Sequence, residues 1–136
     1  MQNLQLAKDY VIRAEKRISA LKALFKEESW ADVVRESQEV VELALKGLLR
    51  AHHIETPRVH DVSEILIAEQ ASLPEKLREH VSKLAKISKS LRRDRELAFY
   101  GSEDLTPLDF YAKDDAVTAL EQATFTVNTV KPYVCV

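Results

Sequence analysis

The densest group of potentially reactive side chains in this chain lies between Ser88 and Gly101. It combines four cations with two carboxylates and closes on two aromatic residues and a glycine. Its members are Lys89, Arg92, Arg93, Asp94, Arg95, Glu96, Phe99, Tyr100 and Gly101. Guanidinium groups hold phosphate through paired N–H donors. The cluster therefore suits a phosphate-bearing ligand, although many solvated helix ends have a similar composition.

Spacing separates the two central arginines. Arg95 follows Leu91 by four residues and precedes Ala98 by three, so it falls on the apolar stripe of its expected helix. A charge on such a stripe must be paired or must emerge at the end of the bundle or at an interface. Arg93 and Tyr100, seven residues apart, share a different face. A structural ion pair and a functional site both remain open.

Charge is distributed unevenly along the second half of the chain. Residues 75–96 carry eight cations and four carboxylates, a net charge of +4, whereas the whole chain carries −2. The segment that follows is acidic, with six carboxylates against Lys113 between residues 103 and 121. This pattern fits either internal charge compensation or a phosphate-attracting groove with an acidic rim.

The elements that position the cluster are predicted to be helices. Apolar residues recur at three- and four-residue steps over residues 4–27, 30–52, 75–100 and 113–130, and a short helix is expected over residues 61–70. Two glycines and four prolines leave few interruptions. The sequence predicts an all-α fold, an up-down helical bundle of four long helices plus one short helix, within a single domain over residues 1–136.

Several local features predict where these helices begin and how they pack. Ser29 and Asp61 are expected to cap the helices that follow them, with Glu64 reaching back toward Asp61. Ala112 is a poor cap for the last helix. Gly47, inside the second helix, favours close packing against a neighbour.

Composition excludes several classes of function. A net charge of −2 and a pI near 6.1 disfavour a broad basic surface for duplex binding. The single cysteine, Cys135, cannot form an internal disulfide, and it is expected in a frayed terminus. No signal peptide, membrane span, phosphate loop or metal-ligand pattern is recognised, so we expect a cytoplasmic protein without a metal or cofactor.

Several segments, in their order along the chain, resemble the HEPN (higher eukaryotes and prokaryotes nucleotide-binding) family. They are residues 35–49, the His60-Asp61 pair, residues 91–100 and residues 110–119. The resemblance covers nearly the whole length. It implies an up-down helical bundle that is often dimeric, in a family of which many members are RNases.

The RNase members of this family carry an arginine followed by a polar residue and, after four to six intervening positions, a histidine. Arg93-Asp94 matches the first half, but Tyr100 stands where the histidine is expected, whether the count starts at Arg93 or at Arg95. Tyrosine, with an unperturbed pKa of about 10, is a poor general base near neutrality. It can still donate a hydrogen bond to phosphate or stack on a base.

The resemblance thus predicts binding of nucleotide or RNA phosphates at a basic cleft at the end of the fourth helix, through Arg93, Asp94, Arg95 and Tyr100. It also implies a homodimer and a nucleotidyltransferase partner in a toxin–antitoxin module. Two alternatives stay open. One is a metal-independent RNase that uses Arg93 and Tyr100 for catalysis, and the other is a non-catalytic interaction module whose arginines only form ion pairs.

Overall fold

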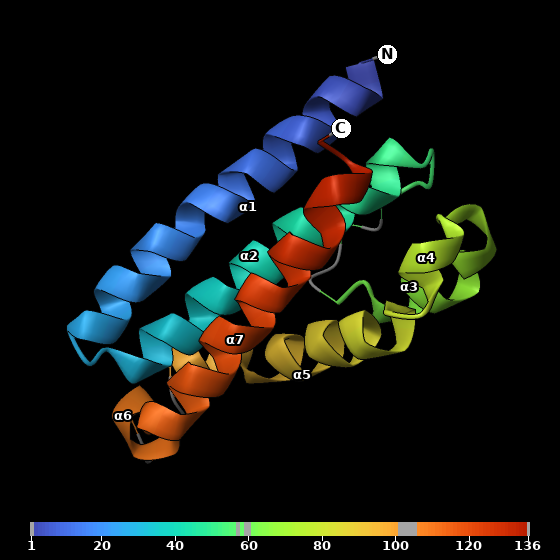
Figure 1. The fold of residues 1–136 in the computed structure, drawn as a ribbon. Helices are drawn as coiled ribbons and strands as arrows, with labels where there is room; N and C mark the ends of the chain where they lie inside the picture. The colour runs from blue at the N-terminus through green and yellow to red at the C-terminus, as the bar shows by residue number, and fades with distance from the viewer. Residues whose placement is uncertain (1, 57, 59–60, 101–105, 136) are drawn as a thin grey trace.

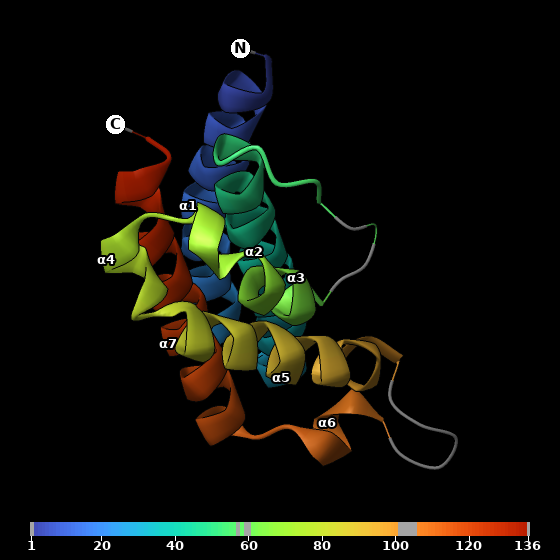
Figure 2. The ribbon, with the colours of Figure 1, turned by 90° about the vertical axis from the view of Figure 1, so that its right-hand side faces the viewer.

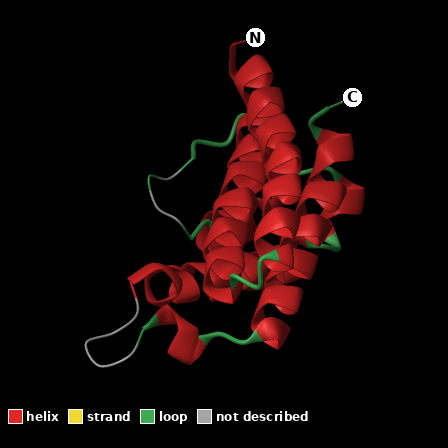
Figure 3. Cartoon of the chain, turned by 90° about the vertical axis from the view of Figure 1, so that its left-hand side faces the viewer, coloured by secondary structure: helices red, strands yellow, loops and turns green. Residues whose placement is uncertain are grey.

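The computed structural model describes residues 2–56, 58, 61–100 and 106–135, with the backbone alone at 2–3, 93–100 and 108–109. Throughout these ranges the chain forms helices joined by turns and loops, and no strand (Figure 3). The all-α prediction is therefore confirmed.

Four long helices build the bundle, as predicted. They are α1 (Gln2–Lys26), α2 (Trp30–Ala51), α5 (Val81–Tyr100) and α7 (Lys113–Val130). Helices α1, α2 and α7 lie side by side, and α5 crosses them at one end of the bundle (Figures 1 and 2). The short elements are α3 (Ser63–Ala68), η1 (Gln70–Ser72), α4 (Glu75–Arg78), α6 (Pro107–Phe110) and η2 (Lys131–Tyr133).

Helix α2 is the centre of the packing, because it contacts α1, α5 and α7. The apolar stripe predicted over residues 30–52 includes Val34, Val41, Leu45 and Leu48, and these four side chains are buried. The stripes predicted for α5 and α7 are also buried where the structure describes their side chains, except for Leu120, which is half-buried. They include Leu84, Ile87, Leu91, Ala119, Ala123 and Val127. Burial of these apolar faces is the main driving force for the bundle.

Gly47 is a point of close contact between α1 and α2. A Cβ atom at this position would lie 2.8 Å from Val11 Cγ2 and 3.0 Å from the carbonyl oxygen of Ala7. The missing side chain therefore lets the two helices pack closely, as the sequence predicted. This contact also fixes where Tyr10 of α1 lies along α2.

The helix expected over residues 75–100 is interrupted at Glu79 and His80. Helix α4 ends with the His80 amide bonded to the carbonyl oxygen of Leu77 at 2.9 Å, and α5 begins at Val81. The Arg78 side chain donates to the carbonyl oxygens of Ala71 and Leu73 at 2.8 and 3.0 Å, which ties α4 to the preceding turn. Figure 2 shows α4 standing off the line of α5.

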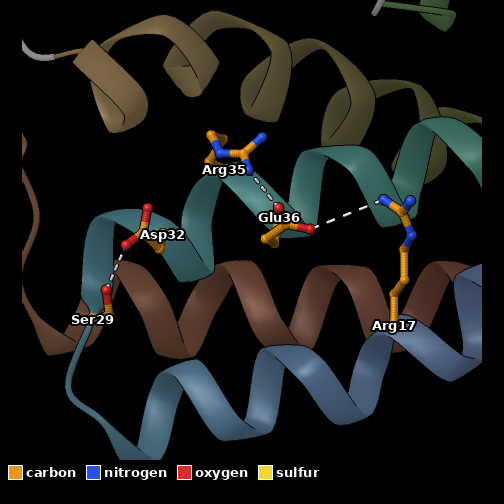
Figure 4. Close-up of polar contacts among 5 residues, drawn as sticks. All are labelled: Arg17, Ser29, Asp32, Arg35 and Glu36. Atoms are coloured by element: carbon orange, nitrogen blue, oxygen red, sulfur yellow. Dashed lines mark hydrogen bonds and ion pairs between the residues drawn. The ribbon is translucent and has the colours of Figure 1, made fainter.

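The start of α2 differs in detail from the expected cap. The Ser29 hydroxyl donates to the Asp32 carboxylate at 2.6 Å and makes no side-chain bond to a helix amide (Figure 4). One turn later Glu36 accepts from Arg35 at 2.6 Å and lies 4.0 Å from Arg17 of α1. At α7, the Asp115 carboxylate accepts the Ala112 amide at 2.8 Å, which forms one half of a capping box, while Ala112 itself offers the helix amides no side-chain acceptor.

The C-terminal turn packs on the bundle, and the expectation of fraying there is wrong. Val134 is buried, Cys135 is half-buried against the core, and the Cys135 amide donates to the carbonyl oxygen of Lys131 at 2.8 Å. The Lys131 ammonium in turn donates to Glu15 of α1 at 2.7 Å.

Candidate functional site

The predicted site residues Arg93, Asp94, Arg95 and Tyr100 occupy the last two turns of α5. Their side chains lie outside the part of the chain that the structure describes. The helical backbone nevertheless places position 93 on the same face of α5 as Lys86 and Lys89, because these positions are seven and four residues apart.

On that face the described residues form a cleft of about 510 Å³, which we call the α5 cleft. It is lined by Asp61, Lys86, Lys89, Ser90 and Arg92. The three cations are exposed, and within the described part of the chain none of them is paired with a carboxylate. Asp61 is the one carboxylate among the lining residues that the structure describes. The described lining of the α5 cleft thus presents net positive charge to solvent.

Asp61 is held by a hydrogen-bond network that connects the start of α3 to α5. The buried Ser88 hydroxyl donates to Asp61 Oδ1 at 3.2 Å and accepts the Val62 amide at 3.0 Å. Asp61 Oδ1 also accepts the Ser63 amide at 2.8 Å. Asp61 thus orders the turn before α3, but it does not cap the helix as predicted. Helix α3 begins two residues later than expected, at Ser63, with Val62 at its N-cap and no side-chain bond to the cap, and Glu64 is exposed.

This arrangement is suited to bind an anion. Lysine and arginine side chains on one helix face attract phosphate, and the fixed carboxylate of Asp61 limits where a phosphate can approach. The described histidines lie elsewhere: His52 Nδ1 is 3.0 Å from the carbonyl oxygen of Leu48, and the His80 ring packs edge-on against Phe125. His60 lies outside the described residues.

Metal binding has no support in the described residues, since no group of three His, Cys, Asp or Glu side chains there could hold an ion. Within the same residues, no helix combines the length and the apolar character that crossing a bilayer requires.

The sequence did not predict a second polar cleft, which lies at the C-terminal end of α2 and which we call the α2 cleft. It measures about 570 Å³ and is lined by Tyr10 of α1, by Lys46 and Arg50 of α2, and by residues 53–56 and Arg58 after it. The four-residue spacing of Lys46 and Arg50 was visible in the sequence. Whether Arg50 comes close to Tyr10, however, depends on the register between α1 and α2.

Comparison with known proteins identifies the family. A model of the HEPN domain matches residues 7–133. This chain belongs to the HEPN family. The match spans all four long helices, so the resemblance noted in the sequence is confirmed.

Two further similarities place this HEPN protein among its relatives. It is 28% identical over 138 residues to the Methanocaldococcus jannaschii protein named "Putative toxin MJ1304", covering 96% of this chain and 90% of that protein. Its fold is similar to the crystal structure of TT1696 from Thermus thermophilus, with a TM-score of 0.74 and 21% identity. That comparison covers 93% of this chain and 97% of the other.

Proposed function

We propose that this HEPN protein binds nucleotide or RNA phosphates at the α5 cleft, and that Arg93, Asp94, Arg95 and Tyr100 extend the site toward the end of α5. The observation that carries the proposal is the face of α5 on which Lys86, Lys89 and Arg92 line one cleft without carboxylate partners among the described residues. Position 93 continues that face by helical register.

Local charge makes this function more favourable than the overall charge suggests. The chain carries −2 in total, yet the described lining residues of the α5 cleft carry three cations and one carboxylate. Each phosphate contact by a cation releases condensed counterions, so the affinity for RNA falls as salt rises. Binding at a few cations is expected to be moderate and strongly salt-dependent.

The biological setting is proposed from the relatives. The M. jannaschii protein carries the name "Putative toxin MJ1304", which supports a role in a toxin–antitoxin module. The nucleotidyltransferase partner in such a module is proposed from the family resemblance. We propose a homodimer as the working form. One core that includes residues from Ala7 to Val134 supports the assignment of residues 1–136 to a single domain.

The test is binding of a fluorescent RNA oligonucleotide in the presence of a chelator. Lys89→Gln should weaken binding and lower the slope of log affinity against log salt by about 0.7 for a single strand. Lys76→Gln makes the same charge change on the exposed face of α4, outside the α5 cleft, and should leave binding unchanged. Equal weakening by both variants would reject the α5 cleft as the site.

A metal-independent RNase is the second candidate, favoured by the toxin name of the relative. In that case the same RNA would be cleaved in chelator, and Arg93→Ala and Tyr100→Phe would abolish cleavage. Cleavage lost in Arg93→Ala would reject a function in binding alone. Intact RNA, bound by the wild type and not by Arg93→Ala, would support it.

A further inference from the structure

We infer that the α2 cleft is a second phosphate-binding site, separate from the α5 cleft. The inference does not rest on the proposed function, because the two clefts share no lining residue among those that the structure describes. The α2 cleft lies between α1, the last turns of α2 and the segment that follows α2, at the opposite end of α2 from its Trp30 start.

Arg50 is the central cation of the α2 cleft. Its guanidinium carbon lies 5.5 Å from the centroid of the Tyr10 ring. Its Nε atom is buried and has no hydrogen-bond acceptor among the described residues. Contact with an aromatic face attracts a cation without neutralising it. Packing and not a carboxylate therefore positions Arg50, and its charge remains available to an incoming anion.

Arg13 provides an internal contrast at the same ring. Its guanidinium carbon lies 5.4 Å from the Tyr10 centroid, but its Nε donates to Asp9 at 2.9 Å, and Arg13 does not line the α2 cleft. With two guanidinium groups beside it, the Tyr10 ring has little free face for a base. The cleft thus offers charge in place of a stacking platform, which favours phosphate over a nucleobase.

The remaining charges of the α2 cleft also favour an anion. Lys46 donates to Glu42 at 2.8 Å, so its charge is largely balanced. Arg58 is exposed, and the exposed Glu55 is the one carboxylate among the lining residues that the structure describes. If Glu42 is counted as the partner of Lys46, the charges that remain are those of Arg50, Arg58 and Glu55. The described lining therefore keeps a net positive charge.

His53 adds a polar side chain at the wall of the α2 cleft, in an unusual backbone conformation. Its φ is 60°, in the left-handed region, and its amide donates to the carbonyl oxygen of Arg50 at 3.2 Å. The next amide, of Ile54, donates to the carbonyl oxygen of Leu49 at 2.9 Å, which completes a C-terminal cap normally made with glycine. His53 thus brings an imidazole to the same cleft as Arg50.

The experiment is an NMR titration of the isotope-labelled full chain with sodium pyrophosphate at low ionic strength. We expect saturable shifts of the amides of residues 50–56. Arg50→Gln should weaken this binding about tenfold, the size of one lost charge-assisted hydrogen bond. Arg13→Gln removes a cation from the same ring outside the cleft and should leave the affinity unchanged. No saturable shift in the wild type, or equal affinities in the wild type and Arg50→Gln, would overturn the inference.

Two further arms keep the result interpretable. Arg58→Gln changes an exposed side chain that the fold does not need, and it should weaken pyrophosphate severalfold even if Arg50→Gln does not fold; no weakening would count against the site. Lys89→Gln should leave the shifts at residues 50–56 intact, and their loss would show that the clefts are not separate. ADP binding as tightly as pyrophosphate would identify free nucleotides as the source of the phosphate, and tighter binding of an RNA oligonucleotide would identify a strand.

Discussion

The Ser88 hydroxyl lies 3.2 Å from Asp61 Oδ1 and accepts the Val62 amide at 3.0 Å. Ser88 is 2% exposed, so this bond joins two distant parts of the chain inside the protein. It fixes the entry to α3 against the middle of α5, between Lys86 and Lys89 of the α5 cleft. The position of Asp61 in the cleft therefore depends on a buried serine.

Ser88→Ala should destabilise the fold by about 1–3 kcal/mol, because the buried Val62 amide loses its acceptor. Urea unfolding followed by the fluorescence of Trp30 measures the change. Ser82→Ala, at an exposed position of the same helix, should stay within about 0.5 kcal/mol of the wild type. Equal effects of the two substitutions would mean that the Ser88 bond contributes nothing specific.

Asp61→Asn should raise the affinity of the α5 cleft for RNA severalfold. The amide oxygen of asparagine can still accept from Ser63 and Ser88, while the one carboxylate among the described lining residues is removed. Anion binding improves when a like charge leaves the site. The oligonucleotide assay in chelator measures it. Weaker binding by Asp61→Asn would show that the carboxylate contributes to recognition and does not merely repel phosphate.

Gly47→Ala should destabilise the protein by about 1–3 kcal/mol, despite the better helix propensity of alanine, because the new methyl group overpacks the α1–α2 contact. The clash involves the backbone oxygen of Ala7 at 3.0 Å, which cannot move without shifting α1. Thermal unfolding measures the loss.

The double substitution Gly47→Ala with Val11→Ala tests that explanation. Removal of the Val11 methyl groups, one of which lies 2.8 Å from the added Cβ, should relieve part of the clash. The two single effects should then sum to more than the effect of the pair. Strict additivity would place the cost somewhere other than in this contact.

The sequence predicted the long helices well because each carries a continuous apolar stripe, and burial of that stripe decides the structure. Leu84, Ile87 and Leu91 are examples of positions predicted to be inside that are buried. The break at Glu79 and His80 was missed. It depends on Arg78, whose side chain bonds to carbonyl oxygens of the preceding turn, and no periodic pattern records such a contact.

The candidate site was predicted in part. The cationic face of α5 could be inferred from helical spacing, whereas the place of Asp61 beside it depends on a bond between residues 27 positions apart. The contact of Tyr10 with Arg50 could not be predicted, since it requires the register that Gly47 sets between α1 and α2. The roles assigned to Arg93, Asp94, Arg95 and Tyr100 stay predictions.

The ion pair between Lys131 and Glu15 should be detectable in a pH titration of the Lys131 side chain. The hydrogen bond and the charge of Glu15 raise the pKa of Lys131 above its ordinary value of 10.5. Because the folded-state pKa is raised, the stabilisation is fully present below the unfolded pKa and is lost as pH rises through the folded pKa. An NMR titration of the Lys131 side chain should show the raised midpoint, and Glu15→Gln should lower it. An unchanged midpoint in Glu15→Gln would mean that the pair does not persist in solution.

A single substitution at the C-terminal end of α1 should stabilise the fold. Glu28 has a φ of 59°, and its amide and that of Ser29 donate to the carbonyl oxygens of Phe25 and Leu24 at 3.0 Å each, a C-terminal cap that favours glycine. The left-handed conformation costs a non-glycine residue about 1–2 kcal/mol, and a glycine at this position avoids that cost. Part of the resulting stabilisation is lost, because glycine gives the unfolded chain more conformational entropy. Glu28→Gly should therefore stabilise the fold by about 0.5–1 kcal/mol in urea unfolding. Glu28→Ala removes the same charge but keeps the Cβ atom, so it should change stability by less than about 0.5 kcal/mol. A gain of equal size in both variants would assign the effect to the lost charge and not to the backbone.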